Sequence, residues 1–509
     1  MRNWTNCIPY TFFTLVIAFI AAAKGTVIGN NTGPSHNKAV FCYVATYADH
    51  RPGRGNFKLE NVDATLCTHI IYAFVLLNES DDSIYPLARW PDLAVDEVDG
   101  RNNISKLKAH YPHLKVTIAI GGWQDGSIKY SRMAANATKR SRFVNNTVDF
   151  LKKHDFDGID LDWSYPSKRG GGRQDKSNLV ALIVDLREAF DIYNYTLTAA
   201  LDPSKDTIDY GYNMTSLSKY LDYMLVWNYD FHGAGWSRHI GHNAPLYSND
   251  LLSASYSINY LIRVGADPNK LVMGVPAFGR NFIAADVIDT SVKLPGLDLK
   301  YNHSFSGPFT QEDGFLGYNE ICLEFRESPE QWKIFWDDYA KVPFAVNGEK
   351  FISYDDVKSI REKVKFANRK KLGGIMVWEL DTDDFRGNCR QKVDGYYDYP
   401  LLRTINNELT RAAEDSDNFL DSEFDNRVAA VLENNSNFNV DDHPREGRPK
   451  TFGYAELEAL LDEDPCQTQQ ELSSVLGVTR QAISKRLHAL GMTRKQGTWI
   501  LYDLKPRDI

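Results

Sequence analysis

Two aspartates and a serine alternate along one short apolar segment of the chain. Asp160, Asp162 and Ser164 occupy every second position of DGIDLDWSYP, residues 157–166. Because successive side chains of a β-strand point to opposite faces, a strand here would direct all three polar groups to one side. Burying two carboxylates costs free energy unless they find partners or protons. The row therefore predicts a functional site, and its carboxyl and hydroxyl groups suit the handling of a sugar.

Eight apolar runs, separated by helical patterns, are available to position this row. Strands that are hydrophobic almost throughout are typical of a parallel sheet covered on both faces, and eight of them predict a closed (β/α)8 TIM barrel. The gap at about residues 281–357 predicts an α+β insertion between strands 7 and 8 of a barrel domain at residues 39–409. The runs span residues 40–47, 68–77, 115–122, 158–165, 196–201, 220–230, 271–278 and 373–380.

The amino-terminal residues are typical of a secretory signal. Arg2 precedes an apolar run that ends in small residues at Ala23, which predicts a cleaved signal peptide at residues 1–23. The run is shorter than the roughly 20 apolar residues that a membrane span needs. We expect a secreted, extracellular protein without a membrane anchor, and a signal anchor is the alternative. Nine glycosylation sequons agree with export, at Asn30, Asn78, Asn103, Asn136, Asn145, Asn194, Asn213, Asn302 and Asn434.

Composition excludes several classes of function. The 509 residues carry a net charge of −9, which argues against nonspecific binding of nucleic acid by the whole molecule. His154 and His232 show no metal-ligand spacing, so we expect no metal and no cofactor. Of six cysteines, Cys7 leaves with the signal and four are expected to pair in an oxidising compartment. These four are Cys42, Cys67, Cys322 and Cys389, and Cys466 is left over.

The composition changes after residue 409. Residues 410–447 are rich in Asp, Glu, Asn and Pro and predict a linker. Helical patterns separated by a tight turn at Gly477 predict a small all-α helix-turn-helix unit at residues 448–509. Between Arg480 and Arg507, seven Lys or Arg and one Asp give a local charge of +6. The candidate DNA contacts of its third helix are Arg480, Gln481, Ser484, Lys485 and Arg486.

The segment DGIDLDWSYP resembles the signature strand of glycoside hydrolase family 18, the chitinases, whose usual form is DGxDxDWEYP. Further blocks occur in the family's order, namely KVTIAIGGW, NYDFHG, GVPAFGR and GGIMVWELDTDDF. The resemblance covers roughly residues 39–407. It implies a barrel that binds chitin or N-acetylglucosamine oligosaccharides, and the disulfide pairs Cys42–Cys67 and Cys322–Cys389.

The resemblance also assigns expected roles to single residues. In this family the 2-acetamido group of the sugar attacks the anomeric carbon while a glutamate protonates the leaving oxygen. Ser164 replaces that glutamate, Asp162 matches the aspartate that orients the acetamido nitrogen, and Asp160 lies behind it. Other matched positions hold the N-acetyl group (Tyr229 and Asp230), form the aromatic floor (Trp378) or line the cleft (Trp123 and Arg280). Four lining positions depart from the family: Tyr47 replaces Trp, His50 replaces Tyr, Trp227 replaces Met and Phe278 replaces Tyr.

Ser164 decides between binding and turnover. A serine hydroxyl is too weak an acid and too short to replace a glutamate, and general acid catalysis contributes typically about 10²- to 10⁴-fold in rate. We therefore expect a monomeric chitinase-like protein that binds chito-oligosaccharides, with hydrolysis lost or strongly impaired. The alternatives are an active chitinase with another proton donor, an empty barrel in which Asp160 and Asp162 are purely structural, and a DNA-binding fusion.

Residues 447–509 resemble the DNA-binding portion of mariner-type transposases and stop before that family's catalytic domain. A secretory signal would carry the chain away from DNA, so we do not expect nucleic acid as a partner. A captured transposon fragment, or an incorrect join between two genes, would explain the combination.

Overall fold

The structure, a computed structural model, describes most of the barrel and a small part of the tail. It covers residues 32–87 and 102–414, and in the tail Leu472, Ile483, Leu487 and residues 492–495 and 498–501. The chain divides into two compact units, Met1–Val428 and Ala429–Ile509. The predicted signal peptide at residues 1–23 lies outside the described residues.

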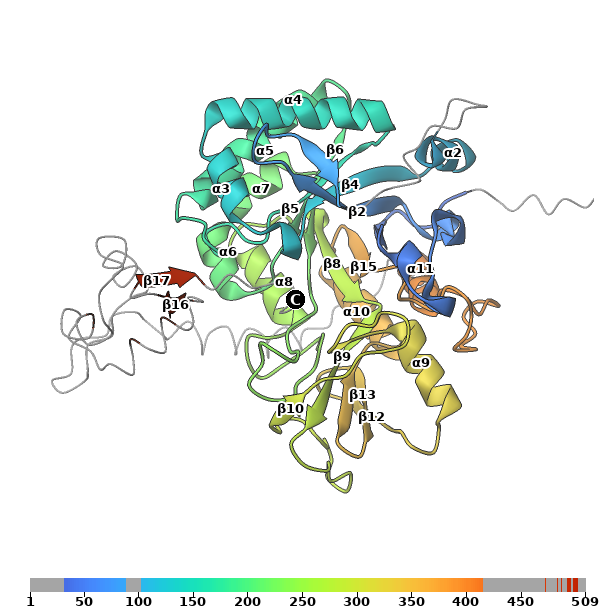
Figure 1. Ribbon diagram of the computed structural model, residues 1–509. Helices are drawn as coiled ribbons and strands as arrows, with labels where there is room; N and C mark the ends of the chain where they lie inside the picture. Colours follow the sequence, from blue (N-terminus) through green and yellow to red (C-terminus); the bar gives the residue numbers. More distant parts are fainter. Residues whose placement is uncertain are drawn as a thin grey trace, which may run out of the picture. The chain divides into compact units, whose positions relative to one another are not determined.

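Eight parallel strands form a closed barrel, because β1 pairs with β15 on one side and with β2 on the other. Nearly every strand residue is buried, as expected for strands that face the barrel interior on one side and helices on the other. The (β/α)8 barrel is thereby confirmed (Figure 1). Its strands are β1 (Ala39–Ala45), β2 (His69–Leu77), β4 (Lys115–Gly121), β5 (Gly158–Asp162), β6 (Thr196–Leu201), β7 (Tyr223–Val226), β8 (Leu271–Pro276) and β15 (Gly374–Trp378).

Helices follow the strands and cover the barrel. In α4 the side chain of Asn136 accepts a hydrogen bond from the Lys139 N–H at 3.1 Å and so caps the helix, whose buried face includes Phe143 and Leu151. One short strand, β3 (Ile84–Pro86), pairs antiparallel with β2. The helices are α2 (Asn103–His110), α3 (Ile128–Ala134), α4 (Ala137–His154), α5 (Asp175–Asp191), α6 (Lys205–Gly211), α7 (Met214–Tyr220), α8 (Ala254–Arg263), α10 (Val357–Arg369) and α11 (Pro400–Glu414).

The predicted α+β insertion lies between β8 and α10 and follows the carboxyl end of β8. Its strands form an antiparallel sheet that stands beside the barrel in Figure 1, with its own apolar cluster around Phe282, Phe344 and Phe351. Because the insertion leaves the barrel at a strand end, it can form a wall beside the barrel mouth. Its elements are β9 (Phe278–Ala284), β10 (Tyr301–His303), β11 (Phe315–Gly317), α9 (Tyr318–Glu327), β12 (Lys333–Asp337), β13 (Val342–Asn347) and β14 (Lys350–Ser353).

Six of the eight barrel strands end earlier than the apolar runs predict, and three of these differences bear on the candidate site. The run at residues 271–278 is divided at Ala277 between β8 and β9. The run at residues 220–230 is a strand only as far as Val226, and the run at residues 158–165 only as far as Asp162. In these last two runs, residues 227–230 and residues 163–165 lie beyond the strand, where the backbone leaves the sheet.

Two further differences concern the end of the barrel and the tail. α11 continues to Glu414, so the first five residues of the predicted linker are helical. The sequence predicts an all-α tail, but the second unit contains an antiparallel pair of strands, β16 (Met492–Lys495) and β17 (Thr498–Leu501). Leu472, Ile483 and Leu487 are helical and buried. Within the described residues, no helix combines the length and apolar character required to cross a bilayer.

Both expected disulfide pairs are present. Cys42 on β1 is bonded to Cys67, which directly precedes β2, and Cys322 on α9 is bonded to Cys389 in the segment after β15. The second bond therefore connects the insertion to the barrel. Cys466 lies outside the described residues.

Candidate functional site

The row predicted from the sequence lies at the carboxyl end of β5, with Asp160, Asp162 and Ser164 all buried. Asp160 accepts hydrogen bonds from the Tyr43 hydroxyl and the Thr198 hydroxyl, each at 2.5 Å. Burial raises the pKa of Asp160 to about 6, and these two hydrogen bonds oppose the rise. Asp160 is thus a buried carboxyl group, held by two hydrogen bonds, at the base of the candidate site.

Asp162 is only half satisfied. Its Oδ1 accepts a hydrogen bond from the Ser164 hydroxyl at 2.9 Å, whereas its buried Oδ2 has no partner among the described residues. Burial, followed by the charge of Asp160, raises the pKa of Asp162 well above its usual range. A buried acceptor without a donor costs free energy in the empty protein. It is a position where a ligand N–H or O–H would be stabilised.

Ser164 stays on the Asp162 side of the chain although β5 ends two residues before it. Its hydroxyl donates to a carboxylate and is fully buried, so it is neither poised nor acidic enough to protonate a leaving group. Its carbonyl oxygen accepts a hydrogen bond from Arg169 Nη1 at 2.9 Å. The same guanidinium stacks 4.0 Å above the ring of Trp123, whose side chain is 64% exposed.

An aromatic floor lies at the end of β15. The half-buried Trp378 packs against Tyr43 and Phe74, with ring centroids 5.0 Å and 5.9 Å apart. Tyr43 is the residue that hydrogen-bonds Asp160, so the floor and the acidic row share one barrel mouth. Flat aromatic faces of this kind suit the apolar faces of sugar rings.

The residues after β7 complete one wall. Asp230 lies in the left-handed region, with φ 59°, and accepts a hydrogen bond from Arg280 Nε at 2.6 Å. Tyr229 is buried against Phe278, and burial, followed by the charges of Asp230 and Asp162, raises the pKa of its hydroxyl well above its usual range. That hydroxyl remains protonated at neutral pH and is able to donate a hydrogen bond.

Several residues of the mouth were not identified from the sequence. Thr198 becomes a partner of Asp160 through the pairing of β5 with β6, whereas Tyr43 reaches Asp160 from β1, which is not a neighbour of β5. Trp236 is 52% exposed, donates its indole N–H to the Asp230 carbonyl and lies 5.0 Å from the Arg280 guanidinium. The sequence signal that could have identified Trp236 was its position just after the NYDFHG block.

A second buried acidic group lies beside the floor. Glu379, which follows Trp378, pairs with Arg51 at 2.8 Å, and Arg51 also pairs with Asp381. Burial, followed by the charge of Asp381, raises the pKa of Glu379. The Tyr47 hydroxyl lies 3.4 Å from Glu379 and joins this cluster to the mouth. His50, another lining position at which this chain departs from the family, is exposed and is not part of the cluster.

No arrangement for a metal is evident among the described residues. The one group of candidate ligands there that lies close enough together is Cys322, Asp384 and Cys389, and its two cysteines form a disulfide. His232 Nδ1 lies 3.1 Å from the His242 carbonyl oxygen, and His154 stacks on Phe150. These histidines have structural contacts.

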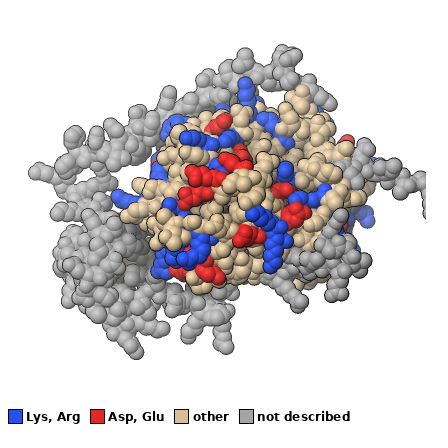
Figure 2. All heavy atoms as spheres, turned by 90° about the horizontal axis from the view of Figure 1, so that it is seen from above, with Lys and Arg blue, Asp and Glu red and all other residues tan. Residues whose placement is uncertain are grey.

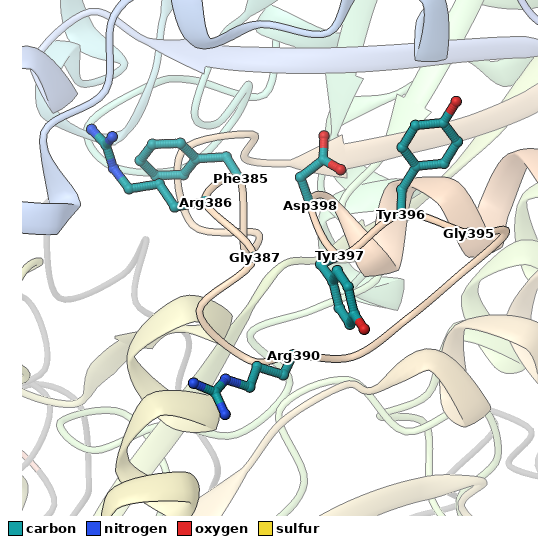
Figure 3. A pocket seen from close by; sticks show the side chains of 8 residues that line it. All are labelled: Phe385, Arg386, Gly387, Arg390, Gly395, Tyr396, Tyr397 and Asp398. Carbon is teal, nitrogen blue, oxygen red and sulfur yellow. The ribbon is translucent and has the colours of Figure 1, made fainter.

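A surface hollow of about 800 Å³ in the segment after β15 is a different feature (Figure 3). None of the predicted site residues lines it. Arg386 donates to the Arg54 and Asn56 carbonyl oxygens, and Asp398 pairs with Arg403 at 2.9 Å. These contacts hold the segment together, so the hollow is not the candidate site.

The tail candidates cannot be placed in the same way, because Arg480, Gln481, Ser484, Lys485 and Arg486 lie outside the described residues. On the barrel face seen in Figure 2, basic and acidic side chains are intermingled. That face shows no uniformly basic patch of the kind that nucleic-acid binding requires.

The fold and the position of the candidate site place this protein among the (β/α)8 barrels, whose sites lie at the carboxyl ends of the strands. Comparison with known proteins narrows this class. The model of glycosyl hydrolases family 18 matches residues 39–383. A probable chitinase 2 of Drosophila melanogaster is 42% identical over 433 residues, which cover 80% of this chain and 87% of that protein.

Solved structures agree with this result. A group IV chitinase of Ostrinia furnacalis in complex with allosamidin is 37% identical, with a TM-score of 0.68, over 74% of this chain and 99% of that one. Human YKL-39, described as a pseudo-chitinase with retained chitooligosaccharide binding, is 32% identical, with a TM-score of 0.64, over 73% of this chain and 100% of that one. The chain belongs to glycosyl hydrolase family 18.

Proposed function

We propose that this chain is a secreted, monomeric member of the family that binds chitin or N-acetylglucosamine oligosaccharides without hydrolysing them. The observation that carries the proposal is the hydrogen-bonded pair at the carboxyl end of β5: Asp162 Oδ2 is a buried acceptor without a partner among the described residues, while Ser164 stands in place of the proton donor. The binding half of the site is present, and the acid is missing. The human pseudo-chitinase with retained oligosaccharide binding supports the combination.

The residues of the mouth suit an N-acetylated sugar. Asp162 Oδ2 would accept the acetamido N–H, and the Tyr229 hydroxyl, kept protonated by its raised pKa, would donate to the acetamido carbonyl. Trp378 would support the ring, and the Arg280–Asp230 pair would fix the wall beside it. Without a carboxylic acid near the leaving oxygen, the bound sugar would dissociate intact.

Active hydrolysis is the second candidate, and Glu379 is the observation that favours it. Its raised pKa keeps a proton on a buried carboxyl within the electrostatic reach of Tyr229. Its side chain is 1% exposed and is held by Arg51, however, so it is not free to reach a leaving oxygen. Loss of any measured hydrolysis in Glu379→Gln would establish that role.

The test of the proposal is Ser164→Glu, with Ser164→Gln as a matched control. Both variants fill the space with a side chain of similar size, but only Glu restores an acid. We expect Ser164→Glu to cleave chitotetraose at least about 100-fold faster than Ser164→Gln, the lower limit for general acid catalysis. Equal rates in the two variants would show that Ser164 is not the missing element.

A further inference from the structure

One tryptophan of the barrel mouth has a donor without an acceptor. Trp227 directly follows β7, and its side chain is half-buried, while its Nε1 is fully buried and has no hydrogen-bond partner among the described residues. Other tryptophans of the described chain do donate to a protein oxygen: Trp163, Trp236, Trp332 and Trp336. An indole N–H can only donate, so burial without an acceptor costs free energy that nothing in the empty protein offsets.

The alternation along β7 places this ring in the barrel interior. Tyr223, Leu225 and Trp227 occupy every second position, and all three pack in the cluster that also includes Tyr229 and Trp378. Because Trp227 is the last of the three, it lies at the carboxyl end of the barrel, where the candidate site lies. Trp227 therefore belongs to the mouth.

The ring also lies beside the residue that follows the acidic row. Trp227 approaches the ring of Tyr165 edge-on, with centroids 6.4 Å apart, and Tyr165 directly follows Ser164. Its backbone N–H donates to the Leu201 carbonyl at the end of β6, the strand between β5 and β7. The buried donor of Trp227 and the buried free acceptor of Asp162 thus lie in one mouth, separated by one strand.

We propose that Trp227 Nε1–H is a sugar-recognition group, which donates a hydrogen bond to a hydroxyl or carbonyl oxygen of the sugar held in this mouth. The inference rests on the proposed function and names a specificity-determining residue for it. A sugar offers both oxygen acceptors and hydroxyl or amide donors, so one ligand satisfies Trp227 and Asp162 together. Where related chitinases usually have Met, which has no donor, this chain gains a directional contact.

The test is Trp227→Phe, which keeps an aromatic ring but removes the N–H. Chitotetraose is titrated into the full chain, and the melting temperature is measured without sugar. We expect affinity to fall about tenfold, the effect of one lost buried hydrogen bond. The melting temperature without sugar should stay the same or rise, because an unpaired buried donor has been removed.

Trp332→Phe is the matched control. Trp332 Nε1 donates to Glu324 Oε1 at 3.1 Å within the insertion. This variant should have a lower melting temperature and an unchanged affinity for chitotetraose, which is the opposite of the result expected for Trp227→Phe.

Two results would overturn the inference alone: unchanged affinity in Trp227→Phe, or a loss of melting temperature like that of the control, which would show that the N–H serves the fold. A wild-type chain that binds no chitotetraose would instead contradict the proposed function, and the inference with it.

Discussion

At the scale of single residues, the spacing of Asp160, Asp162 and Ser164 was enough to predict that they share one face. Period-two alternation is a local property, so the sequence contains it. The residues that support the row could not be predicted in this way. Tyr43 and Thr198 come from other strands, and the Asp160 contacts depend on how those strands are placed in the closed barrel.

Asp160 should make the stability of the barrel depend on pH. Its pKa is raised from 3.8 to about 6 in the folded protein, so the folded state binds the proton more tightly. Its contribution to stability is fully present below about pH 4 and is lost as the pH rises through about 6. Asp160→Asn imitates the protonated form. We expect this variant to be more stable than wild type at pH 7.5 by roughly 3 kcal/mol at most, since one pKa unit corresponds to about 1.4 kcal/mol.

Chemical denaturation of both proteins at pH 4.5 and pH 7.5 measures this effect. The advantage of Asp160→Asn should shrink at the lower pH, where wild-type Asp160 is itself protonated. An advantage that is the same at both pH values would mean that ionisation of Asp160 is not its cause.

At the scale of elements, the strands were predictable and their ends were not. Apolar runs identified all eight barrel strands, because each is buried on both faces. The ends are set by tertiary contacts. The chain leaves β7 at Val226 and turns at Asp230, where Arg280 from β9 holds the aspartate. The candidate site residues collect at these ends, so the backbone that positions them was less predictable than the residues themselves.

The stability of the barrel where β1 meets β15, here called the seam, should depend on Arg51. This residue follows β1 and pairs with Glu379 and Asp381, which follow the neighbouring strand β15. Both carboxyl groups are buried, and Arg51→Met would leave the negative charge of this pair without a compensating cation. We expect this change to lower the free energy of unfolding by about 3–5 kcal/mol at neutral pH. The loss should be smaller in acid, where the carboxyl groups become protonated.

Arg411→Met is the matched control for this seam. Arg411 is 63% exposed and pairs with Glu408, which Arg361 also contacts. Because Arg411 is exposed and Glu408 keeps Arg361 as a partner, the loss should be about 0–1 kcal/mol, and urea denaturation should hardly distinguish this variant from wild type. Similar losses of unfolding free energy in Arg51→Met and Arg411→Met would disprove this role of Arg51.

At the scale of the whole molecule, the sequence indicated two parts of different character. The acidic barrel unit contains every predicted sugar-site residue, whereas the locally basic segment Arg480–Arg507 belongs to the second compact unit. The α+β insertion was predictable from the length of one gap, but its disulfide to the barrel segment was implied by family resemblance rather than derived. The strand pair β16 and β17 was missed, although Thr498, Trp499 and Ile500 are residue types that favour strands.

The division into units predicts the result of a truncation. A chain that ends at Val428 should bind chitotetraose with the affinity of the full chain, since no sugar-site residue is removed. Calorimetric titration of the two proteins side by side measures this. A truncated chain that remains folded but binds several-fold more weakly would assign the tail a part in sugar recognition.

We propose that the barrel mouth has kept its sugar contacts and lost its acid. The most direct test of this proposal is to titrate chitotetraose into the unaltered chain and to analyse the same sample by chromatography over several hours. We expect saturable binding of chitotetraose and a tetramer that remains intact. Steady conversion of the tetramer to shorter oligosaccharides would contradict it.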